Sequence, residues 1–118
     1  QKYRTRLYEQ LKRAKVMMVT CPTAWIDTRR SNMISLSHNS MTPVDEMIPA
    51  GVTVALGTDN VCDAMVPWNG GDMWHELMTL ATGCRYDEME ALAKIATVNG
   101  RRVLGLPPLE NTDFSIQI

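Results

Sequence analysis

Two short runs of apolar residues most constrain what this chain can fold into. Residues 16–20 read VMMVT, and residues 52–58 read VTVALGT. Neither run alternates apolar and polar side chains, so each predicts a strand buried on both faces, as in a parallel sheet covered by helices. Between them, Thr42 and Pro43 predict a short helix, with Thr42 as its N-cap and Pro43 in the first helical position. The two strands and this helix predict a parallel βαβ unit with a right-handed crossover.

Further helices are predicted on both sides of this unit. Apolar side chains at three- to four-residue spacing predict an amphipathic helix over residues 2–14. A second helix is predicted over 72–83, with Gly83 as the glycine that ends it. A third, longer helix is predicted over 87–104, and Gly105 is expected to end it.

The remaining segments are less regular. Residues 21–41 are polar and irregular, which predicts a long loop of the kind that is usually functional or disordered. The tail, residues 107–118, ends in DFSIQI and predicts one more short strand. The chain thus supplies two parallel strands, near 16–20 and 52–58, or three with the tail, followed by C-terminal helices. Because a free-standing parallel sheet needs more strands than this, the fold class is α/β and the pattern indicates a piece of a larger α/β protein.

Composition narrows the classes of partner and compartment. The 118 residues are 45% hydrophobic, as in ordinary globular proteins, and 12 basic against 13 acidic residues leave a net charge of −1. This balance gives no electrostatic case for nucleic acid or an acidic membrane surface. No apolar run approaches the about 20 residues that span a bilayer. Cys21, Cys62 and Cys84 form neither an even disulfide framework nor a CxxC pair, which favours a reduced, cytoplasmic setting.

Chemistry is expected where the strands end. Ligands of parallel α/β folds bind beyond the carboxyl ends of the strands, which are residues 21–23 and the loop that begins at Asp59. The Asp59 carboxylate is either taken up by backbone donors in a turn or committed to a metal, a proton or a cation. Asn60 and Asp63 lie in the same loop, where polar groups are expected to converge on a small molecule. Trp68 is suited equally to stacking on a flat ring and to filling the loop.

Other candidate residues have plain structural interpretations beside the chemical ones. His38 is a candidate metal ligand, but a capping or hydrogen-bonding histidine is favoured. His75 precedes Glu76 as in a zinc-protease helix, yet HELMT lacks the second histidine, so a position on the helix surface is favoured. Cys21 and Cys62 are candidate thiolate ligands or nucleophiles, but no recognised nucleophile or phosphate-binding motif accompanies them, and small buried apolar residues are the default.

A longer stretch of the sequence resembles a known family. Residues 38–73 read HNSMTPVDEMIPAGVTVALGTDNVCDAMVPWNGGDM, and residues 96–106 read ATVNGRRVLGL. These stretches resemble the end of the catalytic barrel, and the helix after it, in amidohydrolase-superfamily enzymes, with cytosine deaminases as the nearest branch. The resemblance implies that residues 1–106 are the C-terminal portion of a TIM-barrel-like (β/α) fold. It also makes the tail, residues 107–118, a candidate first strand of a truncated β-sandwich.

The resemblance also implies a site. Asp59 matches the aspartate that closes the eighth barrel strand, binds or touches a catalytic divalent metal (zinc or iron), and carries protons. Asn60 stands where cytosine deaminases tend to have a second acid, and Met65 where they place an aromatic residue, and both departures argue against cytosine itself as the substrate. The chain has two histidines and no His-x-His pair, which the family uses for further metal ligands. Because such a metal needs at least three protein ligands, the metal site is incomplete in this chain.

The leading hypothesis is a C-terminal fragment of a metal-dependent amidohydrolase that hydrolyses C–N bonds of a small nitrogen heterocycle, a cyclic amide or amidine. Asp59 is then catalytic and metal-facing, and Asn60, Asp63 and Trp68 bind the substrate. The isolated chain is expected to be inactive and to need the rest of the barrel, or to self-associate. The alternatives are a non-enzymatic small α/β ligand-binding or interaction module that folds alone, and a degenerate pseudo-enzyme that associates with an intact homologue.

Overall fold

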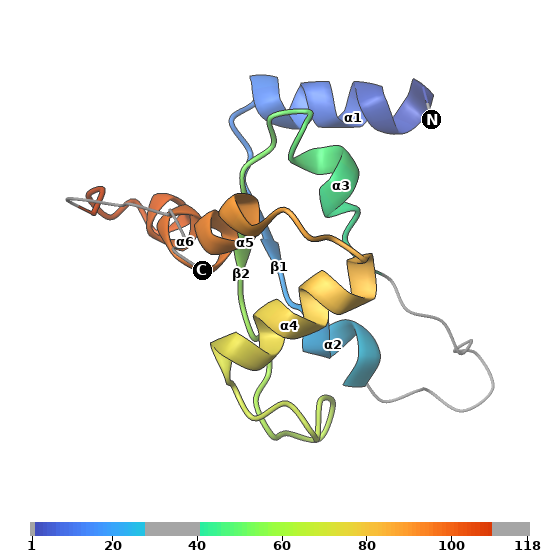
Figure 1. Cartoon of the computed structure of the whole chain (residues 1–118), viewed down its shortest axis with the longest axis vertical. Helices are drawn as coiled ribbons and strands as arrows, with labels where there is room; N and C mark the ends of the chain where they lie inside the picture. Colours follow the sequence, from blue (N-terminus) through green and yellow to red (C-terminus); the bar gives the residue numbers. More distant parts are fainter. Residues whose placement is uncertain (1, 28–40, 110–118) are drawn as a thin grey trace.

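The computed structural model describes residues 2–27 and 41–109 and contains the two parallel strands that the sequence predicts. They are β1 (Met18–Thr20) and β2 (Val54–Leu56), which lie side by side in the middle of the molecule (Figure 1). Both strands are shorter than the apolar runs that predicted them. The combination of helices with a small parallel sheet confirms the α/β class and is consistent with a partial fold.

The two strands are covered unequally. Met18 lies opposite Val54 in the parallel register, and the ladder continues because the Gly57 N–H donates to the carbonyl of Thr20 at 2.9 Å. All three residues of β2 are buried, whereas Val19, in the middle of β1, is 49% exposed. The prediction of a strand buried on both faces is therefore confirmed for β2 and wrong for β1, which carries Val19 into solvent.

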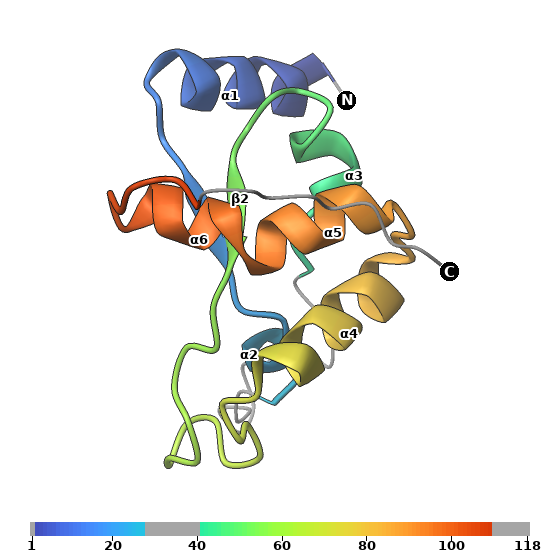
Figure 2. The same ribbon diagram turned by 60° about the vertical axis from the view of Figure 1, so that its left-hand side comes forward.

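Six helices accompany the strands in the part of the chain that the structure describes. They are α1 (Lys2–Arg13), α2 (Pro22–Asp27), α3 (Val44–Met47), α4 (Met73–Cys84), α5 (Met89–Ala96) and α6 (Val98–Val103). α1 and α3 lie toward the amino ends of the strands, α2 and α4 lie toward the carboxyl ends, and α5 and α6 run across β2 (Figure 1, Figure 2). None of these described helices is long and apolar enough to cross a membrane.

A hydrophobic core forms where the helices pack on β2. Its buried members are Tyr8, Val44, Met47, Val52, Val54, Leu56, Leu80, Leu92 and Ile95. Full burial of a large apolar side chain stabilises a fold by about 1.5–3 kcal/mol. Leu80 of α4 and Ile95 of α5 are 0% and 1% exposed, so these two helices contribute strongly to holding β2 in place.

The prediction of a loop over residues 21–41 is wrong for its first part, which forms α2. Pro22 stands at the start of this helix, where its fixed φ is favourable and its missing N–H costs no hydrogen bond. The N–H of Thr23 donates to the Glu76 carboxylate of α4 at 2.8 Å. Because that acceptor lies 53 residues away in the sequence, no local pattern reveals it. Residues 28–40 lie outside the described part.

Thr42 is not the N-cap that the sequence predicts. α3 begins at Val44, with Pro43 in the N-cap position and no side-chain cap. The hydroxyl of Thr42 instead forms a hydrogen bond with that of Thr20, with 2.8 Å between the two Oγ1 atoms, and Thr20 is 2% exposed. Thr42 therefore satisfies a buried hydroxyl group of β1, and such groups are costly when left unpaired.

Two predictions about the later helices are also wrong. Gly83 does not end α4, which is closed by Arg85 in the left-handed conformation at φ 52°. A Cβ added at Gly83 would stand 2.9 Å from Cε of Met41, so the glycine permits that close contact. The single helix predicted over 87–104 is divided into α5 and α6 by Thr97, whose φ of −130° and ψ of −89° are not helical.

The end of the chain is described only in part. Gly105 follows α6 with φ 66°, in the place that the sequence predicts for a helix-ending glycine. Residues 107–109 are described and belong to no strand. The strand predicted in the tail falls mainly on residues 110–118, which lie outside the described part.

Candidate functional site

The carboxyl ends of β1 and β2 meet at one edge of the sheet, as their parallel pairing requires. Cys21 follows β1 directly, and Asp59 follows β2 after two residues. Gly57, the first residue after β2, lies against the end of β1. A Cβ built there would stand 2.8 Å from Cγ1 of Val19 and 3.2 Å from Sγ of Cys21. The absence of a side chain thus leaves room for the Cys21 thiol. The two strand ends are in direct contact.

Asp59 combines an exposed side chain with a left-handed backbone at φ 60°. Aspartate tolerates this conformation better than most residues because its short polar side chain can bond locally. Here Oδ1 accepts a hydrogen bond from the N–H of Asn60 at 2.9 Å. The turn-forming role anticipated for Asp59 is therefore present, and the carboxylate still faces solvent.

Asn60 and Asp63 fold the loop that follows. Oδ1 of Asp63 accepts from the N–H groups of Met65 and Val66, both at 2.8 Å, and Oδ2 accepts from the side-chain amide of Asn60. The backbone hydrogen bonds from Val66 and Met65, followed by that from Asn60, lower the pKa of the Asp63 carboxyl below its ordinary value. Both oxygens of Asp63 are thus engaged within the loop.

Asn69 is a structural anchor of this loop that the sequence analysis missed. Its side chain is buried, with Nδ2 donating to the Thr58 carbonyl and Oδ1 accepting from the N–H of Gly71 at 2.9 Å. Its own carbonyl accepts from the N–H of Cys62 at 2.9 Å. Asn69 thereby ties the loop back to the end of β2. An Asn beside two glycines predicts a turn, and nothing in the local sequence distinguishes this buried side chain from an exposed one.

The other predicted site residues are placed as follows. Trp68 belongs to the same loop and is 85% exposed, and Met65 is also exposed. His75 lies on the exposed surface of α4, as its structural interpretation favoured. His38 lies outside the described residues. The structure thus brings Asp59, Asn60 and Asp63 into one turn and presents Trp68 at its surface.

The described donors do not fit a complete metal site. No group of three His, Cys, Asp or Glu side chains within residues 2–27 and 41–109 could hold a metal ion. Burial, then the negative charges of Asp59 and Glu76, raise the pKa of the Cys21 thiol, so it is poorly suited to be a thiolate ligand or nucleophile. Cys62 is exposed rather than buried, and its thiol donates to the Asn69 carbonyl at 3.2 Å.

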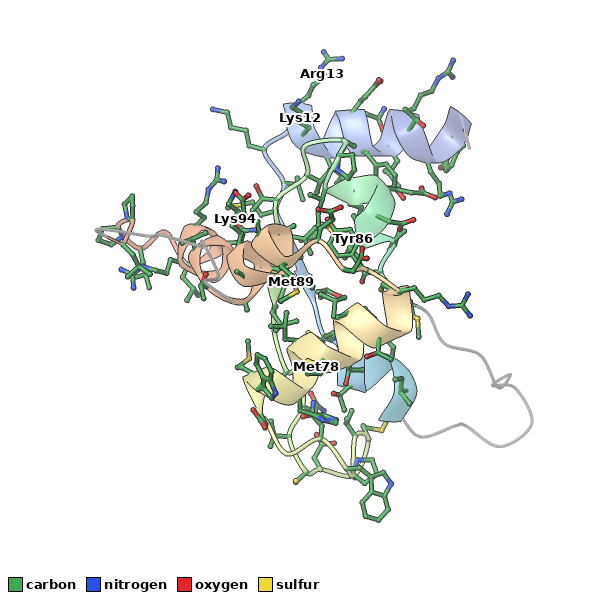
Figure 3. The ribbon with its side chains drawn as sticks, viewed as in Figure 1. Lys12, Arg13, Met78, Tyr86, Met89 and Lys94 are labelled. Carbon is green, nitrogen blue, oxygen red and sulfur yellow. The ribbon has the colours of Figure 1, made fainter. Side chains whose placement is uncertain are left out.

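Two cavities lie beside the amino end of β2, away from Asp59. One, of about 680 Å³, is lined by residues that include Asp45, Tyr86 and Lys94, the last two of which are labelled in Figure 3. The other, of about 510 Å³, adjoins it at Gly51 and is lined by residues that include Lys12. Because Asp59 lines neither, the candidate site is an open turn at the opposite end of the sheet.

Glu76 is a second residue whose place the sequence analysis missed. It belongs to α4, it is 0% exposed, and its Oε2 accepts from the Thr23 N–H at 2.8 Å. Its Oε1 and the Oγ1 of Thr23 are buried without a hydrogen-bond partner among the described residues. A signal was available, because Glu76 lies four residues before the buried Leu80 and therefore on the same face of the helix.

Comparison with known proteins gives one structural neighbour of known activity. The crystal structure of 5-methylcytosine deaminase from Klebsiella pneumoniae, liganded with 5-fluorocytosine, is similar over 88% of this chain, with a TM-score of 0.69 and 25% sequence identity. This chain spans 26% of that deaminase. The similarity supports the resemblance to the amidohydrolase superfamily and a deaminase-like origin of the fold.

Sequence comparison points to two proteins of Haemophilus influenzae, and no family model matches the chain. One, described as uncharacterized, is 53% identical over 47 residues, which are 40% of this chain and 17% of that protein. The other, also described as uncharacterized, is 52% identical over 42 residues, which are 36% of this chain and 93% of that protein. The chain therefore belongs to the same family as this second, short Haemophilus influenzae protein.

Proposed function

We propose that this chain is the last part of a deaminase-like (β/α) barrel and that Asp59 supplies a carboxylate to its hydrolytic site. The observation that carries the proposal is the similarity of 88% of this chain to 26% of a 5-methylcytosine deaminase. Two features agree with it: the sheet has two strands within the described residues, and Asp59 is solvent-facing at their carboxyl ends, where α/β barrels bind their ligands.

The proposed reaction is hydrolytic deamination of a small nitrogen heterocycle. Water adds to the ring carbon that bears the amino group, one of its protons goes to the leaving nitrogen and the other to the neighbouring ring nitrogen, the C–N bond breaks, ammonia leaves, and the oxygen remains as a carbonyl group. A carboxylate near this carbon accepts the proton of the attacking water and returns it to the leaving nitrogen, a contribution of typically about 10²–10⁴ in rate. Asp59 is the exposed carboxylate that we assign to this proton transfer.

We also propose roles for the other residues of this loop and for the metal ligands. We assign the substrate side of the loop to Asn60 and Asp63, which bond to each other beside Asp59, and to Trp68, whose exposed indole suits stacking on a flat ring. Zinc or iron needs at least three protein ligands. Because Asp59 is the ligand that we assign among residues 2–27 and 41–109, we propose that further ligands come from segments outside these residues.

A chimeric enzyme tests the role of Asp59. Residues 16–106 of this chain replace the structurally equivalent stretch of the Klebsiella deaminase, and ammonia release from 5-methylcytosine and cytosine is measured. Asp59→Asn is expected to lower the rate about 10²–10⁴-fold, because an amide cannot carry the proton. Asp45→Asn is the matched control, since Asp45 is exposed near the amino end of β2, and it is expected to leave the rate unchanged.

Two results would contradict the proposal. A folded chimera whose Asp59→Asn variant keeps the full rate would remove Asp59 from the chemistry. Efficient ammonia release by the lone 118-residue chain, supplied with zinc or iron and with cytosine or creatinine, would show that its site is complete without further segments.

A further inference from the structure

We infer that Glu76 is a positioning residue for the Asp59 site: its buried carboxylate fixes the first turn of α2 and, through Cys21, the end of β2. The inference rests on the proposed function, because it concerns how the same strand ends are held. α2 and α4 lie together beyond the carboxyl ends of the strands (Figure 1).

The start of α2 needs an acceptor that its own sequence does not supply. A helix leaves its first N–H groups without intrahelical partners, and Ser, Thr, Asp or Asn usually satisfies one of them. α2 is preceded by Cys21 and has no acidic residue in its first turn. Glu76 takes this role from α4, with 2.8 Å between its Oε2 and the N of Thr23. A negative charge is also favourable at the positive end of a helix.

The choice of a carboxylate at this position is costly, which indicates a function beyond packing. Glu76 is 0% exposed, and an ionised group out of water is unfavourable unless it is well bonded. An apolar residue of similar volume would often serve the core equally well or better. Oε1 of Glu76 has no hydrogen-bond partner among the described residues. The hydrogen bond to Thr23 is therefore the contact that offsets the free-energy cost of burying this carboxylate.

Contacts lead from this bond to Asp59. Thr23 is two residues from Cys21, and Pro22 between them restricts the backbone. The Cys21 thiol lies against Gly57, 3.2 Å from a Cβ built there, and Gly57 is two residues before Asp59. A shift in the first turn of α2 consequently moves the thiol on which the end of β2 rests. Leu80 lies one turn further along the same face of α4 and belongs to the hydrophobic core.

Amide NMR of the full chain tests the inference with three variants. Glu76→Leu is expected to remove the downfield shift that a carboxylate gives the Thr23 amide proton, to speed its hydrogen exchange roughly tenfold or more, and to move the amide signals of Cys21 and Asp59. Glu76→Gln retains an oxygen acceptor and is expected to restore the Cys21 and Asp59 signals. Leu80→Ala, the matched control, is expected to lower stability, to leave the Thr23 signal in place, and to move the Asp59 signal less than Glu76→Leu does.

The inference is overturned if Glu76→Leu leaves the Asp59 signal unmoved, or if Leu80→Ala moves it as far. Should Glu76→Leu fail to fold, Glu76→Asp takes its place, because it keeps the charge but shortens the reach to Thr23, and it is expected to move the Asp59 signal. No turnover is measured, so failure here leaves the test of Asp59 in the chimeric deaminase independent.

Discussion

At the scale of single residues, the loop after β2 shows what the sequence can and cannot predict. Position after a buried strand predicted that Asp59, Asn60 and Asp63 gather in one place, and the structure brings them into one turn. It did not predict that both oxygens of Asp63 bond within the loop. Nor did it find Asn69, because an Asn in a glycine-rich turn has no pattern that reveals burial.

The pH dependence of the loop follows from Asp63. Its folded pKa is lowered, chiefly by the N–H groups of Val66 and Met65, so its carboxylate stabilises the loop above the ordinary pKa of aspartate, and that stabilisation is lost as the pH falls through the lowered value. An NMR titration of the Asp63 carboxyl carbon is expected to give a midpoint below that of an aspartate in an unfolded peptide. A midpoint at the unfolded value would show that these hydrogen bonds do not form in solution.

At the scale of helices and strands, predictions succeeded where the signal was local. The apolar periodicity of residues 2–14 predicted α1, and the run at 52–58 predicted the buried strand β2. α2 was missed because its first turn is capped by Glu76, which is distant in the sequence. Gly83 was misjudged because a glycine that ends a helix and one that admits a neighbour, here Met41, look alike in sequence.

The contact between the strand ends predicts the effect of adding one methyl group. Gly57→Ala places a Cβ 2.8 Å from Cγ1 of Val19, a stiff β-branched side chain, so Val19 or the strand must shift. The expected cost is about 1–3 kcal/mol of unfolding free energy. Urea unfolding of the chimeric deaminase, which carries residues 16–106, measures it.

Gly100→Ala is the matched control for this substitution. Gly100 lies inside α6, and a Cβ added there meets nothing within 4 Å. The same change is therefore expected to stabilise the protein by about 1 kcal/mol through helix propensity. If the two variants shifted stability in the same direction by the same amount, the close packing at Gly57 would be refuted.

At the scale of the whole molecule, the parallel sheet and the α/β class could be predicted from the two apolar runs. The exposure of Val19 in β1 could not be predicted, because a run of apolar residues does not show which segments pack against it. Large apolar side chains remain exposed on both β1 and the helices, among them Val19, Ile26, Trp74 and Met78. Under the proposed function, further segments of a barrel would cover this surface.

Equilibrium unfolding of the lone chain in urea, followed by tryptophan fluorescence and far-ultraviolet circular dichroism, tests this account most directly. Because β1 is incompletely covered, the lone chain is expected to self-associate. Its unfolding transitions are then expected to be broad, to differ between the two probes, and to depend on protein concentration. A monomer that unfolds in one cooperative transition, coincident by both probes and independent of concentration, would contradict the account and favour a self-sufficient α/β module.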